Sequence, residues 1–311
     1  MEHVPSRFVW ALALVLSAAG LGPPCAAQPP AGPLVIGHAG SGFFHPFNSL
    51  PPSSLRGIER ALRLGADGVE VDLRLSQDSV PVLYHDYTLN SMTNGRGCVS
   101  QTPAAALVQL RYRGGWLHDW RQHERIIPFD TLLARLARRP EFPYLHLDLH
   151  EDDACAANDT ARSRALARRL RELLTHYQVP AHRLLILTNR PATLRYLHQL
   201  LPAVPLGLEL STDFEADLLQ LRQLPWVQAA VVHKDDITPA RAARLHSLGQ
   251  QVVVFGGRSA RAERRVVATA PEAYQADNVR RLRAMLRRGN IPTESRLRKR
   301  PLLALGRERS D

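Results

Sequence analysis

Residues 65–75 read GADGVEVDLRL, and this stretch contains the pattern that decides the fold. Apolar side chains alternate with Glu70 and Asp72, which is typical of an ordered β-strand. Because one residue separates the two carboxylates, both point to the same face of that strand. Their oxygens suit a hard divalent cation such as magnesium or calcium. A solvated surface face is the alternative explanation for a Glu-x-Asp pair taken alone.

Further strand-like segments follow along the chain, and amphipathic segments separate them. The strand-like runs are residues 34–40, 144–150, 184–188, 205–210, 227–232, 251–255 and 273–277, with a further short run at 81–84. Helix-start signals precede later segments at Thr160, Thr238 and Ser259. Strand then helix, repeated about eight times, predicts an α/β fold of the TIM (β/α)8 barrel type.

Residues 86–125 are too long for an ordinary connection, so we expect an insertion after the second strand. It could form a small lid over the mouth of the barrel. Trp116 and Trp120 lie in this segment. They would either shape a substrate pocket or cap a small core of the insertion itself.

Two histidines and a third carboxylate also fall at the ends of predicted strands. His38 lies in residues 34–40, His85 follows residues 81–84, and Asp148 lies in residues 144–150. Catalytic residues of TIM barrels occupy the C-terminal ends of the strands. Histidine can give or take a proton near neutrality because its ordinary pKa is about 6.5. A pair of histidines beside carboxylates therefore indicates a metal site with proton transfer.

Three motifs in this region occur in an order shared with a known family. They are Gly37-His38-Ala39-Gly40, then Gly65-Ala66-Asp67-Gly68-Val69-Glu70-Val71-Asp72, then Leu83-Tyr84-His85-Asp86 with Leu89 and Thr93 beyond it. The chain resembles the glycerophosphodiester phosphodiesterase family over residues 34–97. Weaker agreement continues through residues 127–130 and 144–150.

The resemblance implies a TIM barrel that hydrolyses glycerophosphodiesters to glycerol 3-phosphate and an alcohol. It implies that a hydroxyl of the substrate attacks phosphorus, and that water opens the resulting cyclic phosphate. Catalytic histidines would be His38 and His85, with their acid and base roles left open. The metal ligands for magnesium or calcium would be Glu70, Asp72 and Asp148. Substrate contacts are expected from Asn48 and His150.

Several positions depart from the family pattern. Ala39 stands where the family has an arginine, which removes a planar two-point phosphate clamp. Asp148 and His150 stand where the family usually has Glu-x-Lys. His150, His45 or Arg74 are candidates to supply the missing charge. 

The loop after His38 also departs from the family, because residues 46–49 lack its usual glutamate. Asn48 is alternatively an ordinary turn or cap residue. Ser53 or Ser54 could match the family's helix-start threonine.

Composition limits the possible partners. The chain has 311 residues, of which 45% are hydrophobic and 22% charged, so a folded domain is expected rather than a disordered one. A net charge of +11 suits anionic phosphodiesters or lysolipids, and it allows peripheral contact with an anionic membrane. The arginines lack aromatic interleaving and zinc-finger spacing, so nucleic acid is not an expected partner. The oligomeric state stays open.

The two ends are expected to lie outside the barrel, which we place at residues 28–290. Arg7 precedes an apolar run, and small residues end at Ala27, so residues 1–27 resemble a cleaved signal peptide. A retained membrane anchor or a lipid on Cys25 are the alternatives. Residues 291–311 form a basic C-terminal tail. We therefore expect an exported protein, either periplasmic or secreted.

Once this leader is removed, Cys98 and Cys155 are the remaining cysteines. An oxidising compartment would allow them to form a disulfide that pins the loop after His85. Two unpaired thiols are the alternative.

Two other function classes stay open at the sequence level. One is a non-catalytic barrel that binds phosphoesters or lipids, suggested by the changes at positions 39, 148 and 150. The other is a phospholipase D-like enzyme that acts on choline-headed lysolipids. The retained histidine pair favours catalysis, because a binding protein needs no proton transfer.

Overall fold

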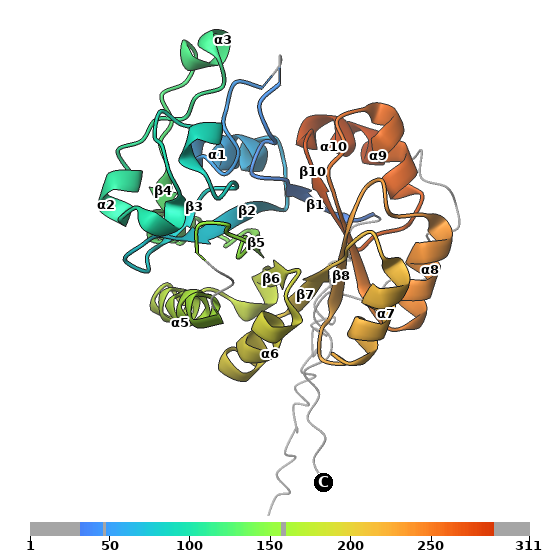
Figure 1. Ribbon diagram of the computed structural model, residues 1–311. Helices are drawn as coiled ribbons and strands as arrows, with labels where there is room; N and C mark the ends of the chain where they lie inside the picture. Colours follow the sequence, from blue (N-terminus) through green and yellow to red (C-terminus); the bar gives the residue numbers. More distant parts are fainter. Residues whose placement is uncertain (1–31, 46–47, 157–159, 289–311) are drawn as a thin grey trace, which may run out of the picture.

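The computed structural model describes residues 32–45, 48–156 and 160–288. Eight parallel strands form a closed barrel, because the first strand pairs with both the second and the last. In barrel order the strands are β1 (Leu34–Gly37), β2 (Gly68–Leu75), β5 (Tyr144–Leu149), β6 (Leu184–Thr188), β7 (Leu206–Glu209), β8 (Ala229–His233), β9 (Gln251–Phe255) and β10 (Ala273–Ala276). The predicted TIM barrel is confirmed (Figure 1).

Helices follow the strands and surround the barrel (Figure 1). They are α1 (Leu55–Arg63), α4 (Phe129–Leu136), α5 (Thr160–His176), α6 (Pro191–Leu200), α7 (Phe214–Arg222), α8 (Pro239–Ser247), α9 (Ala260–Val267) and α10 (Val279–Arg287). The predicted start signals at Thr238 and Ser259 are confirmed as caps, since each hydroxyl accepts a hydrogen bond from a backbone N–H of the first turn. Ser54 caps α1 in the same way.

Apolar side chains fill two layers. One layer packs between the strands and the surrounding helices, and a smaller cluster around Ile36, Leu187 and Val231 fills the barrel interior. His146 is also buried, and its Nδ1 accepts a hydrogen bond from the Gln275 amide at 3.0 Å. Burial lowers the pKa of His146 to about 3, so this imidazole is neutral in the folded protein.

The insertion after the second barrel strand is confirmed. β3 (Pro81–Leu83) pairs antiparallel with β2, and β4 (Ile127–Pro128) pairs with β3, so the strand predicted at 81–84 lies outside the barrel ring. Between them lie η1 (Leu89–Ser91), η2 (Val99–Gln101), α2 (Ala104–Leu107) and α3 (Trp116–Asp119); a further short helix, η3 (Ala181–Arg183), precedes β6.

The insertion has its own small core, which includes Tyr84, Leu107 and Ile126. Trp120 is 78% exposed, so the expectation that it caps this core is wrong. The side chain of Trp116 lies outside the described residues.

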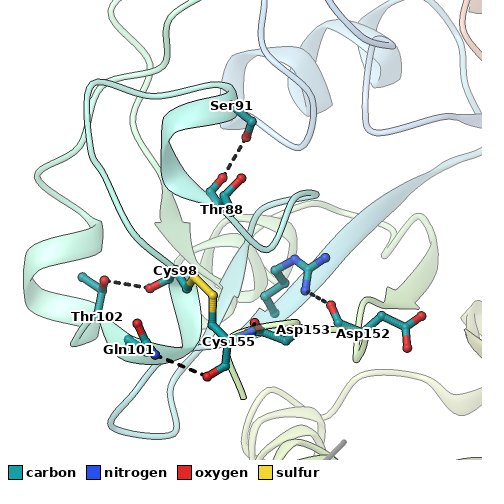
Figure 2. The surroundings of a disulfide bond; sticks show 9 residues. Thr88, Ser91, Cys98, Gln101, Thr102, Asp152, Asp153 and Cys155 are labelled. Atoms are coloured by element: carbon teal, nitrogen blue, oxygen red, sulfur yellow. Dashed lines mark hydrogen bonds between the residues drawn. A yellow bond between two sulfur atoms is a disulfide. The ribbon is translucent and has the colours of Figure 1, made fainter. Parts of the chain in front are cut away.

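A disulfide joins the insertion to the barrel. It links Cys98 in the insertion to Cys155 in the segment that follows β5, so the alternative of two unpaired thiols is wrong (Figure 2). Gln101 and Thr102 donate side-chain hydrogen bonds to the carbonyls of Cys155 and Cys98, respectively. The two segments are therefore held by the disulfide and by the hydrogen bond from Gln101 to Cys155.

The predicted signal peptide and the predicted basic tail lie outside the described residues. Among the residues that the structure describes, no helix is both long and apolar enough to span a membrane.

Candidate functional site

Carboxylates from two neighbouring strands meet at the C-terminal end of the barrel. Glu70 and Asp72 lie on β2, and the strand register places Asp148 of β5 directly opposite Asp72. One carboxylate oxygen from each of the three residues lies within 4.8 Å of the others. The structure thus brings together the three side chains that were predicted as metal ligands.

Glu70 has one oxygen in use and one without a partner. Its Oε2 accepts a hydrogen bond from the backbone N–H of Ala39 at 2.6 Å. Its Oε1 is buried and has no hydrogen-bond partner among the described residues. Burial, and then the charge of Asp72, raises the pKa of Glu70 well above its ordinary value. An orphaned buried oxygen beside two other carboxylates fits a hard divalent cation.

Asp72 is held from two sides. The Ser53 hydroxyl donates to its Oδ2 at 2.8 Å, and Nε2 of His150 lies 3.0 Å from its Oδ1. Burial alone would raise the pKa of Asp72, but the hydrogen bond and charge of His150 outweigh it and lower this pKa. Asp72 is therefore an anion throughout the neutral range.

His38 follows β1 and forms an ion pair with Asp277, which directly follows the last strand, β10. Its Nδ1 lies 2.7 Å from Oδ1 of Asp277, and the two side chains are 16% and 7% exposed. Burial lowers the pKa of His38, but Asp277, together with Glu70 and Asp72, outweighs this effect and raises it to about 9. Since Nδ1 is bonded to Asp277, Nε2 is the nitrogen left for a substrate.

His85 follows β3 in the insertion and is paired in a similar way. Its Nδ1 lies 2.6 Å from Oδ1 of the adjacent Asp86. The ring of Phe43 contacts both histidines, with centroids 5.5 Å from His38 and 5.1 Å from His85. The two histidines thus flank one aromatic side chain, and each keeps its Nε2 free of its carboxylate partner.

Arg74 fixes the segments that carry His85 and His150. Its guanidinium donates to the carbonyls of His85, His150 and Asp152, at 2.7, 3.0 and 2.9 Å. It is buried, and its Nε and Nη1 hold backbone. This geometry favours a structural role for Arg74 over that of a phosphate ligand.

Asn48 is also engaged with the protein itself. Its amide nitrogen donates to backbone carbonyls of the loop, including those of Ser41 and Gly42, and its oxygen accepts from Arg60. Asn48 is 3% exposed. This geometry favours the turn-residue alternative over a substrate contact. His45 lies in the same loop, where its backbone pairs with that of Asn48.

Other residues reach the site without having been singled out from the sequence. Asp277 and Phe43 are described above. Glu209 ends β7, and burial together with the charge of Asp148 raises its pKa to about 7. Arg258 follows β9, and its Nε lies 3.8 Å from Oδ2 of Asp277. Glu209 and Asp277 both stand at the ends of predicted strands, and this position was the only sequence feature that could have marked them as site residues. It is too weak, because ordinary loop residues also follow strands.

Taken together, these side chains can bind a cation and move protons. Three carboxylates supply oxygen ligands, and two imidazoles with oriented Nε2 atoms lie beside them. Phosphodiester hydrolysis requires these functional groups, because the negative charge on the phosphoryl oxygens must be neutralised and two protons must be transferred.

Comparisons with known proteins identify relatives of this chain among phosphodiesterases. One relative is "Probable glycerophosphodiester phosphodiesterase 1" of Mycobacterium tuberculosis, 39% identical over 89 residues, which are 29% of this chain and 30% of that protein. Another is a glycerophosphodiester phosphodiesterase of Caldanaerobacter subterraneus, 39% identical over 77 residues, or 25% of this chain and 30% of that protein. The matches thus span less than a third of these relatives.

A solved structure from Oleispira antarctica extends the likeness in fold to most of the chain. It is a phosphodiesterase in complex with the product sn-glycerol-3-phosphate, with a TM-score of 0.68 and 22% identity. The alignment covers 82% of this chain and 97% of that one. The model of the glycerophosphoryl diester phosphodiesterase family matches residues 38–289. The chain therefore belongs to the glycerophosphoryl diester phosphodiesterase family.

Proposed function

We propose that this protein hydrolyses glycerophosphodiesters to glycerol 3-phosphate and an alcohol, with a divalent metal ion. The observation that carries the proposal is the pair of oriented histidines, His38 and His85, beside the cluster of Glu70, Asp72 and Asp148. Family membership and the product complex of the Oleispira relative support the substrate class.

The two histidines divide the proton transfers. Nε2 of one histidine takes the proton of the attacking substrate hydroxyl as the new P–O bond forms. Nε2 of the other gives a proton to the leaving alkoxide oxygen as the old P–O bond breaks. In the second half, water attacks phosphorus and loses a proton to one histidine, a ring P–O bond of the cyclic phosphate breaks, and the released alkoxide oxygen takes a proton from the other histidine. Asp277 and Asp86 hold the rings in position through Nδ1.

Glu70, Asp72 and Asp148 would hold the cation. When bound there, it supplies positive charge that neutralises the phosphoryl oxygens. Glu70 and Asp72 would then raise the pKa of His38 less, because their charge is offset. His38 would in this way come closer to a pKa that suits a base near neutrality.

Arg258 is the candidate for the phosphate-binding cation that Ala39 does not provide. Its side chain is 58% exposed, and its Nε pairs loosely with Asp277, the carboxylate that orients His38. A planar guanidinium there could bind a phosphoryl oxygen next to His38.

The test is release of glycerol 3-phosphate by the purified chain. Substrates are glycerophosphocholine, glycerophosphoethanolamine and lysophosphatidylcholine, each with magnesium, calcium or a chelator. We expect metal-dependent release from the first two, abolished in Glu70→Gln and retained in His176→Gln, which changes an exposed histidine on α5. Release of choline from the lysolipid alone would favour a phospholipase D. Binding without turnover would favour the non-catalytic barrel.

We also propose that the chain is exported. The disulfide between Cys98 and Cys155 supports this, because such bonds persist in oxidising compartments. Fractionation of cells that express the full chain would test it. Recovery of the protein in the cytoplasm with both thiols reduced would contradict it.

A further inference from the structure

Two imidazoles and a carboxylate form a second cluster beside the three carboxylates. One ligand atom from each of Asp72, His85 and His150 lies within 4.8 Å of the others. The rings of His85 and His150 have centroids 4.6 Å apart. Asp72 belongs to both clusters. Histidine at position 150 makes this cluster possible, because an imidazole can bind a metal ion whereas a protonated lysine there could not.

Each imidazole has a nitrogen within the cluster. Nε2 of His150 lies 3.0 Å from Asp72 and 3.4 Å from Asp148, so a metal ion could replace its proton there. Nδ1 of His85 is bonded to Asp86, which leaves Nε2 as its ligand atom. Metal-binding histidines generally give their other ring nitrogen to a carboxylate in this manner.

The backbone around the cluster is held in place before any ion binds. Arg74 bonds the carbonyls of both His85 and His150, so one guanidinium fixes the two histidine-bearing segments side by side. The disulfide joins the same two parts of the chain, through Cys98 and Cys155. Little backbone ordering is therefore left for an incoming ion to impose.

We propose that Asp72, His85 and His150 form a second metal site, selective for a divalent transition-metal ion such as zinc. Two imidazoles and one carboxylate match the ligands of zinc, whereas the all-oxygen cluster of Glu70, Asp72 and Asp148 matches magnesium or calcium. Ligand atoms around zinc are separated by about 3–4 Å, given bonds of about 2.0–2.2 Å. The present separations of up to 4.8 Å are larger, so His85, the most exposed of the three side chains at 37%, would have to turn toward the other two when zinc binds.

Occupation of this site would control activity. Zinc on Nε2 of His85 uses the electron pair that would accept or return a proton, so the zinc-loaded protein would not turn over. The binding itself does not depend on hydrolysis and can be measured without a substrate.

The experiment is zinc binding by the full chain in the presence of excess magnesium. The protein is first stripped with chelator and kept free of reductant, so that Cys98 and Cys155 stay oxidised and cannot bind metal. Zinc per chain is then measured by elemental analysis, and cobalt(II) absorption reports nitrogen ligation. We expect one zinc per chain in the wild type, and at least about 100-fold weaker binding in His150→Lys.

A matched set of variants separates the two clusters. His176→Gln, the control, should bind zinc as the wild type does. His85→Gln should lose zinc binding, and it provides the test if His150→Lys does not fold. Zinc affinity unchanged in His85→Gln would overturn the proposal. So would displacement of zinc by millimolar magnesium, because it would place the zinc on the carboxylates. If the protein proves unable to hydrolyse glycerophosphodiesters, the zinc stoichiometry still decides this site.

Discussion

The two histidine–aspartate pairs of the site are built in opposite ways. His38 and Asp277 are 239 residues apart, meet where the last barrel strand closes on the first, and are nearly buried. His85 and Asp86 are adjacent in sequence, lie in the insertion, and are 37% and 32% exposed. The same side-chain geometry thus depends on barrel closure in one pair, and on Arg74 and a disulfide in the other. Two histidines that are oriented in the same way can therefore be held in place by different interactions.

The largest effects are expected from removing either imidazole. We predict that His38→Gln and His85→Gln each lower turnover of glycerophosphocholine by about 10²- to 10⁴-fold, because general acid–base catalysis contributes about that much. Circular dichroism and thermal unfolding should show an intact barrel. Turnover like that of the wild type in one variant would remove that histidine from the mechanism and break the symmetry between the pairs.

Removing the disulfide should affect the two pairs unequally. Cys98→Ser with Cys155→Ser opens a crosslink across 57 residues, and we expect the free energy of unfolding to fall by about 2–4 kcal/mol. Histidine signals in NMR spectra should change for His85 and stay unchanged for His38. Equal changes at both histidines would show that the insertion also supports the barrel-side pair.

The buried pair of His38 and Asp277 should make the free energy of unfolding depend on pH. The folded-state pKa of His38 is about 9, above its ordinary value of 6.5, so its stabilising contribution is complete below pH 6.5 and disappears as pH rises through 9. Urea unfolding of metal-free protein at pH 6 and pH 9.5 should therefore show a smaller difference in Asp277→Asn than in the wild type. An equal difference in both proteins would exclude Asp277 as the main cause of the raised pKa.

The smallest effect is expected from the exposed carboxylate. Asp86→Asn should lower turnover by about tenfold or less, because water screens a partly exposed pair. Asp277→Asn should cost more, since its pair with His38 is buried. A steady-state comparison of the two variants at one pH ranks them. The reverse order would mean that orientation of His85 matters more than burial of His38.

Sequence patterns were enough to predict much of this molecule. Alternation of apolar strands with capped helices predicted the barrel and the insertion after its second strand. The Glu70-x-Asp72 spacing predicted carboxylates on one face, and the structure brings Asp148 beside them. The strand at residues 81–84 was also predicted, but the pattern could not show that it pairs outside the barrel.

Other features could not be predicted from the sequence, because side chains that are distant in the chain come into contact only after folding. Trp120 was expected either to shape a substrate pocket or to cap the core of the insertion, and it is exposed because other side chains fill that core. Arg74 looked like a possible phosphate ligand and instead binds three backbone carbonyls.

The sequence by itself determined the elements and their periodic faces, because local propensity and side-chain alternation are properties of short segments. Only the tertiary structure decided that Asp277 orients His38, that Cys98 joins Cys155, and that His85 and His150 lie ring to ring. The physical reason is barrel closure and register, which bring together residues that no local interaction connects.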